Sequence, residues 1–429
     1  MVLTPPPLGQ REPVSAYARE PAFGAGWANK LVGGLRWGPS GETKGGDEVL
    51  SRRQVEMLRQ FQPGPDVVVS FYLDVSPDRY PRREYQVTAR NLLREARESL
   101  DPALPREVRR AAEADLDRVE QFVGLGFQRE GGVRGLSVFA CAPRGLWQVY
   151  GLPGPVPDLV VPGRAPYLRP LWLQLHDYPR FLVVLVERAG SRFLEVGGGQ
   201  VREVESLASD VPPRVRRSGW AGLKGRRIER HIDDHVQRHL KEVAGRAATL
   251  AEERDCDCLV VGGNPALAQQ LLDSLGSPWR ERVLGTLPVT AGARPAEVLQ
   301  AVTELNREVS ASRGRKALEE LLAELRAGGQ VVTGLPGTLR AVQEGAATTV
   351  VVDSEFTASG FRCPACGHLG LEAGTCPRCA RALLPTPDLV TELMALALER
   401  GCQVERVGGV PRRDRLRGVG ALLRYLPGP

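Results

Sequence analysis

The sequence predicts a mixed α/β protein built from three domains, with a small cysteine-rich module inserted in the third. Three observations support this fold class. Short apolar runs rich in β-branched residues alternate with longer segments whose apolar residues recur every three or four positions, the pattern of strands and helices in α/β domains. A series of three strand-like runs precedes one long helix in the middle of the chain. Two Cys-x-x-Cys motifs lie close together near the C-terminal end.

Length and composition are those of an ordinary globular protein. A chain of 429 residues with 42% hydrophobic and 25% charged residues is long enough for about two to four domains. It has no apolar run of about 18 residues and no signal-like N-terminus, so we expect a cytoplasmic protein without a membrane span. The net charge of +6 favours an acidic partner only weakly at this length. Only five of the 57 lysine and arginine residues are lysines, so phosphate contacts would come from forked guanidinium groups.

The N-terminal third predicts an arm followed by a first domain. Residues 1–48 are rich in glycine and proline and show no lasting periodicity, so we expect a disordered or loosely docked arm. Residues 49–166 predict an α/β domain that contains the buried strand VVVSFYLDV. Its other predicted elements are helices at 48–61, 81–99 and 103–126, a strand at 135–142, and two strands separated by a proline-rich turn within 146–163.

Residues 167–308 predict a central domain. The segment FLVVLVERAGSRFLEVGGGQVREVESL is typical of three antiparallel strands. Its Gly198-Gly199-Gln200 lies between two strand-like runs, where a hairpin turn accounts for it. A basic, glycine-bearing loop follows, and then a helix whose apolar stripe begins at Ile228. Strand, helix and strand come next, and a last helical stretch has a predicted break near residues 310–313.

Residues 309–429 predict a C-terminal α/β domain. Residues 335–345 are typical of a helix and residues 347–353 of a strand, and the cysteine-rich module at 361–382 interrupts the order that follows. A second helix has Thr386 as its predicted N-cap and Gly401 as its stop. Two strand-like segments close the chain.

The two Cys-x-x-Cys motifs predict a metal site. The four residues are Cys363, Cys366, Cys376 and Cys379. Each motif directs two sulfurs at one point, and four thiolates complete a tetrahedral shell for Zn²⁺. Because this shell leaves no open position, the ion would be structural rather than catalytic. A redox dithiol or a metal-free knuckle is the alternative, and we expect His368 to be exposed and not a ligand.

A cationic segment lies between the three strands and the long helix. A flexible basic loop mounted on an anchored helix suits a polyanion, and a tryptophan within it can stack on a base. The alternative is an ordinary solvated basic loop. The residues predicted to contact RNA are Arg214, Arg216, Arg217, Gly219, Trp220, Gly222, Lys224, Gly225, Arg226 and Arg227.

Other motifs predict structural roles. His231, His235 and His239 recur at a spacing that can hold a metal, but the His-Glu-x-x-His order and a further ligand are missing, so we expect half-buried structural histidines. Gly262-Gly263-Asn264 predicts a turn after a strand. No phosphate-binding glycine loop or catalytic triad is evident, and we predict no catalytic residues.

The order of these segments resembles the archaeo-eukaryotic class of peptide release factors and Pelota, and is most similar to their bacterial relatives, which include the ribosome hibernation factor Balon. VVVSFYLDV and GLSVFA resemble strands of the family's N-terminal domain, and the meander, basic loop and long helix resemble its central domain. GTLRAVQEGAATTVVVD, the cysteine motifs, DLVTELMALALERGCQVERV and GVGALLRY follow the order of its C-terminal domain. The resemblance implies a three-domain, release-factor-like architecture with a zinc ribbon inserted in the C-terminal domain.

Two departures from the family pattern bear on function. The family's catalytic Gly-Gly-Gln lies in the loop before the long helix, where this chain has SGWAGLKGRRIERH without glutamine. The stop-codon motif Asn-Ile-Lys-Ser is missing from RESLDPALPREVRRA, the corresponding region. The resemblance therefore implies a non-enzymatic factor that occupies the ribosomal A site up to the peptidyl-transferase centre in hibernation or rescue. A translational GTPase such as elongation factor Tu is the implied partner. The alternatives are a peptidyl-tRNA hydrolase of stalled ribosomes and a non-ribosomal RNA-binding zinc-ribbon protein.

Overall fold

The structure, a computed structural model, describes residues 36–37, 43–44, 50–129, 132–188, 190–208, 222–386, 388–408 and 413–425. Side chains are described from residue 50 onward, except in residues 222–233 and 413–414. Of the predicted N-terminal arm, the structure describes only an antiparallel pair, β1 (Arg36–Trp37) and β2 (Thr43–Lys44). The rest of residues 1–48 lies outside the described residues.

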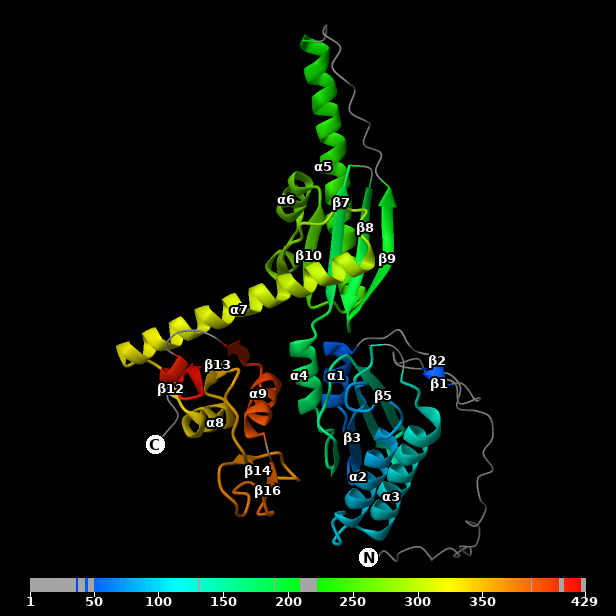
Figure 1. The fold of residues 1–429 in the computed structure, drawn as a ribbon, viewed down its shortest axis with the longest axis vertical. Coiled ribbons are helices and arrows are strands. Elements are labelled where there is room, and N and C mark those ends of the chain that lie inside the picture. Colours follow the sequence, from blue (N-terminus) through cyan, green and yellow to red (C-terminus); the bar gives the residue numbers. More distant parts are fainter. Residues whose placement is uncertain are drawn as a thin grey trace, which may run out of the picture.

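An antiparallel four-stranded sheet forms the core of the N-terminal unit, in the order β5-β4-β3-β6 (Figure 1). Every residue of β3 and β4 is buried, because helices cover both faces of the sheet. Burial on both faces explains why the sequence shows a continuous apolar run instead of alternation. The strands are β3 (Val68–Asp74), β4 (Gly135–Cys141), β5 (Leu146–Leu152) and β6 (Leu159–Gly163).

Two helices lie on each face of this sheet. Phe71 and Leu73 pack with the first pair, α2 and α3, whereas Val68 and Tyr72 point to the opposite face and pack with α1 and α4. A single π-helical turn, Phe122–Gly126, follows α3. The helices are α1 (Arg52–Arg59), α2 (Tyr85–Glu98), α3 (Arg106–Gln121) and α4 (Arg169–Asp177).

Helix α4 is an element that the sequence pattern did not predict. Pro170 occupies its first turn, where the missing N–H has no intrahelical partner to lose. Leu171, Trp172 and Leu175 are buried against the N-terminal sheet, and Leu173 packs against the core of the C-terminal unit. A helix of nine residues that is apolar toward two different units has no single stripe, so periodicity does not reveal it.

The central unit is a mixed five-stranded sheet in the order β11-β10-β7-β8-β9. The predicted antiparallel meander is confirmed as β7–β8–β9, and β10 and β11 extend the sheet in parallel to β7. Helices α5 and α6 cover one face, and the first part of α7 covers the other. The elements are β7 (Phe181–Glu187), β8 (Gly190–Gly197), β9 (Gln200–Ala208), α5 (Gly222–Glu253), β10 (Cys258–Gly263), α6 (Pro265–Ser274), a 3₁₀ turn (Trp279–Arg282), β11 (Val283–Thr286) and α7 (Pro295–Ala327).

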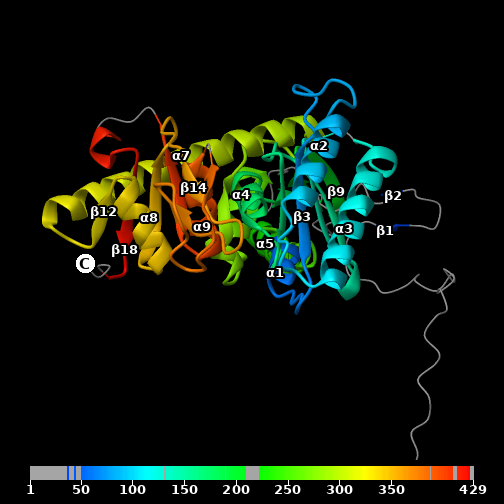
Figure 2. The ribbon, with the colours of Figure 1, turned by 90° about the horizontal axis from the view of Figure 1, so that it is seen from below.

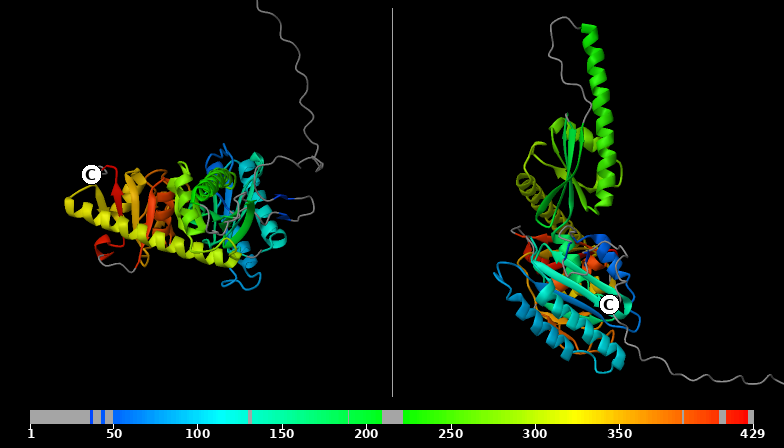
Figure 3. Two further views of the ribbon diagram at one scale, coloured as in Figure 1. Left: turned by 90° about the horizontal axis from the view of Figure 1, so that it is seen from above. Right: turned by 90° about the vertical axis from the view of Figure 1, so that its right-hand side faces the viewer.

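Helix α5 begins earlier than predicted. Its first turn starts at Gly222, so the prediction of a loop up to Ile228 is wrong for the backbone of residues 222–227. Two glycines cost about 1 kcal/mol each in a helix. Leu223, Arg226 and Arg227 favour helix, and adding residues to a helix of 32 is far easier than nucleating one. The amino end of α5 extends well past the central sheet (Figures 1 and 3).

Helix α7 is continuous over 33 residues, so the predicted break near residues 310–313 is wrong. Val298 and Val302 pack on the central sheet, whereas Leu318 and Leu321 belong to the core of the C-terminal unit. Gly314 is needed between these halves, because a Cβ there would lie 2.3 Å from the carbonyl oxygen of Arg406. Figure 2 shows α7 running along both units, and the predicted domain boundary at 308/309 falls inside it.

The C-terminal unit is a mixed four-stranded sheet in the order β12-β18-β13-β17, with α8 and α9 on one face and the second part of α7 on the other. A small antiparallel sheet, β15-β14-β16, is inserted between β13 and α9. The elements are β12 (Val331–Thr333), α8 (Leu335–Glu344), β13 (Ala347–Asp353), β14 (Gly360–Arg362), β15 (Leu369–Gly370), β16 (Leu384–Thr386), α9 (Leu389–Glu399), β17 (Gln403–Val407), a 3₁₀ turn (Arg413–Leu416) and β18 (Val419–Leu423).

The cap of α9 differs from the prediction. Thr386 ends β16, and the N-cap is Asp388, whose carboxylate accepts the backbone N–H of Thr391 at 3.0 Å. A carboxylate at this position accepts a hydrogen bond from an otherwise free N–H, and its negative charge interacts favourably with the positive end of the helix dipole. The predicted stop is confirmed, because Gly401 follows the helix with a φ of 77°. In the described parts of the chain, no helix is both long and apolar enough to cross a membrane.

Candidate functional site

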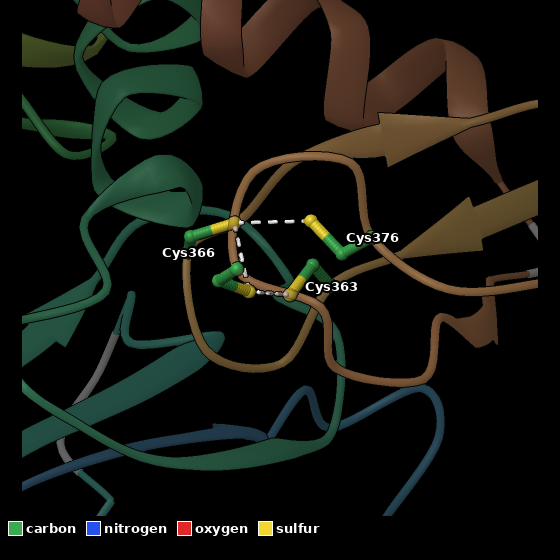
Figure 4. A group of neighbouring side chains, drawn as sticks. Cys363, Cys366 and Cys376 are labelled. Carbon is green, nitrogen blue, oxygen red and sulfur yellow. Dashed lines mark hydrogen bonds between the residues drawn. The ribbon is translucent and has the colours of Figure 1, made fainter.

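The four predicted cysteines come together at the inserted sheet. Cys363 Sγ lies 3.3 Å from Cys379 Sγ. Cys366 Sγ lies 3.5 Å from Cys376 Sγ and 3.6 Å from Cys379 Sγ. Figure 4 shows the labelled sulfurs of Cys363, Cys366 and Cys376 directed toward one another. All four sulfurs lie within 4.8 Å of one another, and among the described residues this is the only group of three or more metal-ligating side chains so arranged.

The two motifs share one backbone geometry. The N–H of Gly367 donates to the carbonyl of Cys363 at 3.0 Å, and the N–H of Ala380 donates to the carbonyl of Cys376 at 2.9 Å. Gly367 and Ala380, which follow the second cysteine of each motif, have positive φ angles of 68° and 57°. A positive φ at alanine costs about 1 kcal/mol or more, so the surrounding fold holds this turn in place. Each turn thereby points its two sulfurs the same way.

The arrangement fits a tetrahedral metal ion. Metal–sulfur bonds of about 2.3 Å would place sulfurs about 3.8 Å apart, close to the separations observed. Burial opposes ionisation of the Cys363 thiol, but backbone N–H groups of Cys366 and Ala365 and the neighbouring thiols outweigh it and lower its pKa to about 7, whereas burial and the neighbouring thiols raise the pKa of Cys366, so Cys363 ionises first in the metal-free group. A thiolate is the ligand form of cysteine. Four cysteines that together could bind a metal are therefore brought together as the sequence predicted.

His368 lies beside this site without belonging to it. Its backbone carbonyl accepts the N–H of Cys363 at 2.8 Å, but its imidazole is not part of the metal-ligating group. The prediction that His368 is exposed is wrong, because the residue is half-buried and its Nδ1 has no hydrogen-bond partner within the described chain. Burial and the positive charges of Arg378 and Arg169 lower its pKa, so the ring is neutral near pH 7.

A half-buried charged cluster links the N-terminal unit to the C-terminal unit next to the cysteines. We call Tyr167, Arg169, Arg362 and Glu392 the α4 ion cluster. Arg169 Nη1 lies 2.7 Å from Glu392, and its Nη2 donates to the carbonyl of Gly367 in the first cysteine turn. The Tyr167 hydroxyl donates to Glu392 at 2.6 Å, and the Arg362 guanidinium lies 4.7 Å from the centre of the Tyr167 ring. Burial and Glu392 raise the pKa of Tyr167, so it stays protonated as a donor.

Two further ion pairs connect the same units. Arg406 of β17 forms a two-pronged pair with Asp177 at the end of α4, at 2.8 and 3.3 Å. Arg381, two residues past the second cysteine motif, donates to Asp101 in the loop between α2 and α3. None of these residues is marked by a sequence pattern. Their partners lie about 220 to 280 positions away, and the only local signal was an arginine inside the apolar segment YLRPLWLQL.

The predicted RNA-contacting residues lie at or before the amino end of α5. Arg214, Arg216, Arg217, Gly219 and Trp220 lie outside the described residues. The others are on the first turns of α5, of which the structure describes the backbone only: Gly222, Lys224, Gly225, Arg226 and Arg227. These turns are the part of the central unit that projects beyond its sheet (Figure 3), and we call residues 214–227 the cationic tip.

The Gly-Gly-Gln tripeptide is a hairpin turn, as predicted. Gly197 pairs with Gln200 across it, and Gly198 and Gly199 have φ angles of 59° and 76°, which suit a two-residue turn with two left-handed positions. A Cβ on Gly132 of the N-terminal unit would lie 3.4 Å from the carbonyl oxygen of Gly198, so the turn faces that unit. Strand β9 runs from this turn toward the segment that precedes α5, which places the tripeptide at the opposite end of the sheet from the amino end of α5 (Figure 1).

The remaining motifs have structural roles. His239 is buried and its Nε2 lies 3.2 Å from the Ser191 hydroxyl, His235 is half-buried, and the side chain of His231 lies outside the described residues. Gly263 has a φ of 96° and Asn264 caps α6, which confirms the predicted turn.

Comparison with known proteins confirms the family resemblance inferred from the sequence. Residues 166–307, the central unit and α4, match the model of bacterial archaeo-eukaryotic release factor family 10. The chain is similar to peptide chain release factor subunit 1 of Thermococcus onnurineus, with 22% identity over 416 residues that cover 87% of this chain and 97% of that protein. It is also similar to the protein of the same name from Methanopyrus kandleri, with 28% identity over 217 residues that cover 47% and 50%.

Similar chains also occur among solved structures, and two of them serve as examples. One is the archaeal translation termination factor aRF1, with 16% identity, coverage of 88% of this chain and 99% of that chain, and a TM-score of 0.24. The other is a model of ribosome-bound archaeal Pelota and ABCE1, with 13% identity, coverage of 89% and 96%, and a TM-score of 0.38.

Proposed function

We propose that the chain is a ribosome-binding translation factor that occupies the A site and directs its cationic tip toward the peptidyl-transferase centre without hydrolysing peptidyl-tRNA. The observation that carries this proposal is the location of the two motifs in the central unit, the part that matches the release-factor family. The tip at the amino end of α5 is cationic and lacks glutamine, whereas the Gly-Gly-Gln is a hairpin turn at the far end of the sheet. Such a factor would hold an RNA active site closed in hibernation or rescue.

The positive charge of the tip suits it to bind rRNA phosphates. Arg214, Arg216, Arg217, Lys224, Arg226 and Arg227 offer six cationic groups within fourteen residues, and the helix N-terminus adds free N–H groups that favour anions. Contacts of this kind with rRNA phosphates release counterions, so binding weakens steeply with salt. Trp220 would stack on an unpaired base.

Ribosome cosedimentation at increasing salt tests the proposal. Replacing Arg214, Arg216 and Arg217 by alanine is expected to weaken binding and to reduce the slope of log affinity against log salt by roughly 2 to 3. The matched control is an alanine variant of three exposed arginines elsewhere, Arg280, Arg294 and Arg307, which is expected to bind as wild type. Equal binding by the tip variant and wild type would refute the role of the tip. Absence of wild type from every ribosomal fraction would support the remaining alternative, an RNA-binding zinc-ribbon protein that acts away from ribosomes.

A peptidyl-tRNA hydrolase is the second candidate. The tip contains three glycines, Gly219, Gly222 and Gly225, and backbone N–H groups that no side chain shields can stabilise the oxyanion of ester hydrolysis. Peptide release from stalled ribosomes by the purified chain at saturating concentration would favour this candidate, and its absence would favour the non-enzymatic factor.

The metal at the four cysteines is proposed to be Zn²⁺ in a structural role. A closed set of four thiolates suits zinc and leaves no position for substrate or water. Metal analysis of the purified chain is expected to give one zinc per molecule, and a Cys363→Ser/Cys376→Ser variant is expected to give none. We further propose a translational GTPase such as elongation factor Tu as delivery partner. Copurification in a GTP-bound complex tests this, and its absence under conditions that preserve ribosome binding would contradict it.

A further inference from the structure

An arginine-lined cleft lies where the N-terminal unit, the C-terminal unit and the first cysteine turn meet. Its volume is about 620 Å³, and it is formed by α1, α4, the ends of α8 and α9, and both cysteine motifs. The helices that line it, α1, α4, α8 and α9, lie below the central sheet in Figure 1, on the side away from the projecting end of α5. The charged side chains that line it are Arg52, Arg59, Arg169, Arg378, Arg400, Glu56 and Glu399.

The cleft has more positive charge than its own carboxylates neutralise. Two of its arginines have local partners, because Arg59 lies 3.4 Å from Glu56 and Arg169 is paired with Glu392. Within the described chain, Arg378 and Arg400 have no carboxylate within 4.0 Å, and Arg52 has only Asp257 at 3.9 Å. Glu399, the remaining acid of the lining, lies 3.8 Å from Arg169. Three guanidinium groups from three separate elements therefore face one cleft with no close acidic partner inside it.

The crowding of these charges is unfavourable in the free protein. Burial lowers the pKa of Arg400, the nearby charges of Arg378 and Arg169 lower it further, and Glu399 offsets only part of this effect. One Arg400 donor is used by the carbonyl of Gln343 at 2.8 Å, at the end of α8, and a guanidinium has four more N–H groups. An anion in the cleft would relieve this repulsion and use the free donors, so the site gains stability when it is occupied.

The donor type identifies the class of anion. Guanidinium forks match the tetrahedral oxygens of phosphate and bind them with two parallel hydrogen bonds. The volume lies in the range of sites for nucleotide-sized ligands, roughly 300 to 1,000 Å³. We propose that this cleft binds phosphate groups, supplied either by a free oligophosphate ligand or by the backbone of RNA, through Arg52, Arg378 and Arg400. This site is separate from the cationic tip and does not depend on the function proposed for it.

Isothermal titration of the full-length, metal-loaded chain with inorganic tripolyphosphate at low salt tests the site. Replacing Arg378 and Arg400 by glutamine is expected to weaken tripolyphosphate binding at least tenfold. The control, Arg280→Gln in the central unit, removes an exposed charge far from the cleft and is expected to bind as wild type. No binding to wild type, or equal binding by wild type and the double variant, would overturn the proposal.

Two further measurements show whether the variant is still folded and whether the phosphate groups come from RNA or from a free oligophosphate. Because Arg378 lies inside the second cysteine motif, the metal content of the double variant is compared with that of wild type. If the metal content of the double variant has changed, the Arg52→Gln variant in α1 is the test. Weakened tripolyphosphate binding by that variant would support the site, and unchanged binding would overturn it. A short single-stranded oligoribonucleotide identifies the source. RNA binding that is weakened by the Arg378→Gln/Arg400→Gln pair supports an RNA backbone, and RNA binding that is unchanged while tripolyphosphate binding is lost supports a free oligophosphate.

Discussion

Replacing Arg169 by methionine is expected to destabilise the chain by about 3 kcal/mol, since removing one partner of a buried ion pair costs about 3 to 5 kcal/mol. The pair is buried enough for this range to apply, because the side chains of Arg169 and Glu392 are only 6% and 15% exposed. We expect the lower end because Glu392 keeps the Tyr167 hydroxyl at 2.6 Å and Arg362 at 3.8 Å. Methionine fills most of the volume of the arginine side chain, so the loss of stability reflects the missing charge more than a cavity.

Urea unfolding measures this loss. Circular dichroism follows the whole chain, and tryptophan fluorescence, to which the buried Trp172 of α4 contributes together with five other tryptophans, gives a second probe. Arg307→Met is the control, because Arg307 pairs with Glu304 at a site where its side chain is 72% exposed, and it is expected to change stability by less than about 0.5 kcal/mol.

A double-mutant cycle with Glu392→Gln identifies the interaction. If Arg169 and Glu392 act as a pair, the double variant is less destabilised than the sum of the single variants by about 1 to 3 kcal/mol. Additive effects within about 0.5 kcal/mol, or a loss below about 1 kcal/mol for Arg169→Met, would show that the α4 ion cluster does not hold the two units together.

The other predictions rest on single features. Gly314→Ala is expected to destabilise by about 1 to 3 kcal/mol in urea unfolding, because its Cβ would meet a backbone carbonyl at 2.3 Å. The matched Gly245→Ala in α5, where a Cβ meets nothing within 4 Å, is expected to stabilise by up to about 1 kcal/mol, and equal effects would contradict the packing argument. Burial lowers the pKa of His239 below 6.5, so protonation favours the unfolded state and stability falls as pH drops below about 6.5. A His239→Gln variant is expected to flatten this part of the profile, and an unchanged slope would assign it to other groups. Cys376→Ser is expected to speed proteolysis within residues 361–382 several-fold, and an unchanged cleavage rate would argue against a metal that orders this module.

Much of the fold follows from local sequence patterns. The run of residues 67–75, the meander and the glycine turn at Gly198-Gly199 are each specified by a period or a turn residue within a dozen positions, and the structure has them where expected. The cysteine site is predictable for the same reason, because each motif fixes its own turn. The positions at which helices begin and break depend less on the local sequence. Serines near residue 310 weaken helix propensity only slightly, so tertiary packing on both sides keeps α7 intact.

The contacts between units could not be predicted from one sequence. Arg169 and Glu392 are 223 positions apart, and the local sequence around either residue gives no indication of its partner. The same limit hid the arginine-lined cleft, whose guanidinium groups come from α1, the second cysteine motif and the end of α9. Each arginine by itself is typical of a solvated surface, and only the fold shows that their charges are concentrated.

The cysteine site and the inter-unit contacts are one structural system. Gly367 donates its N–H to Cys363 within the first turn and accepts Arg169 at its carbonyl, so the geometry of that turn sets where the guanidinium lies. The second motif repeats the link through Arg381 and Asp101, and it also supplies Arg378 to the cleft. A closed four-thiolate shell has no open position for chemistry, and it would have no catalytic use here. Its physical consequence is to hold two turns rigid, and those turns contact the N-terminal unit at two separate points. A metal bound by these cysteines would therefore stabilise the relative positions of the N- and C-terminal units and the shape of the cleft between them.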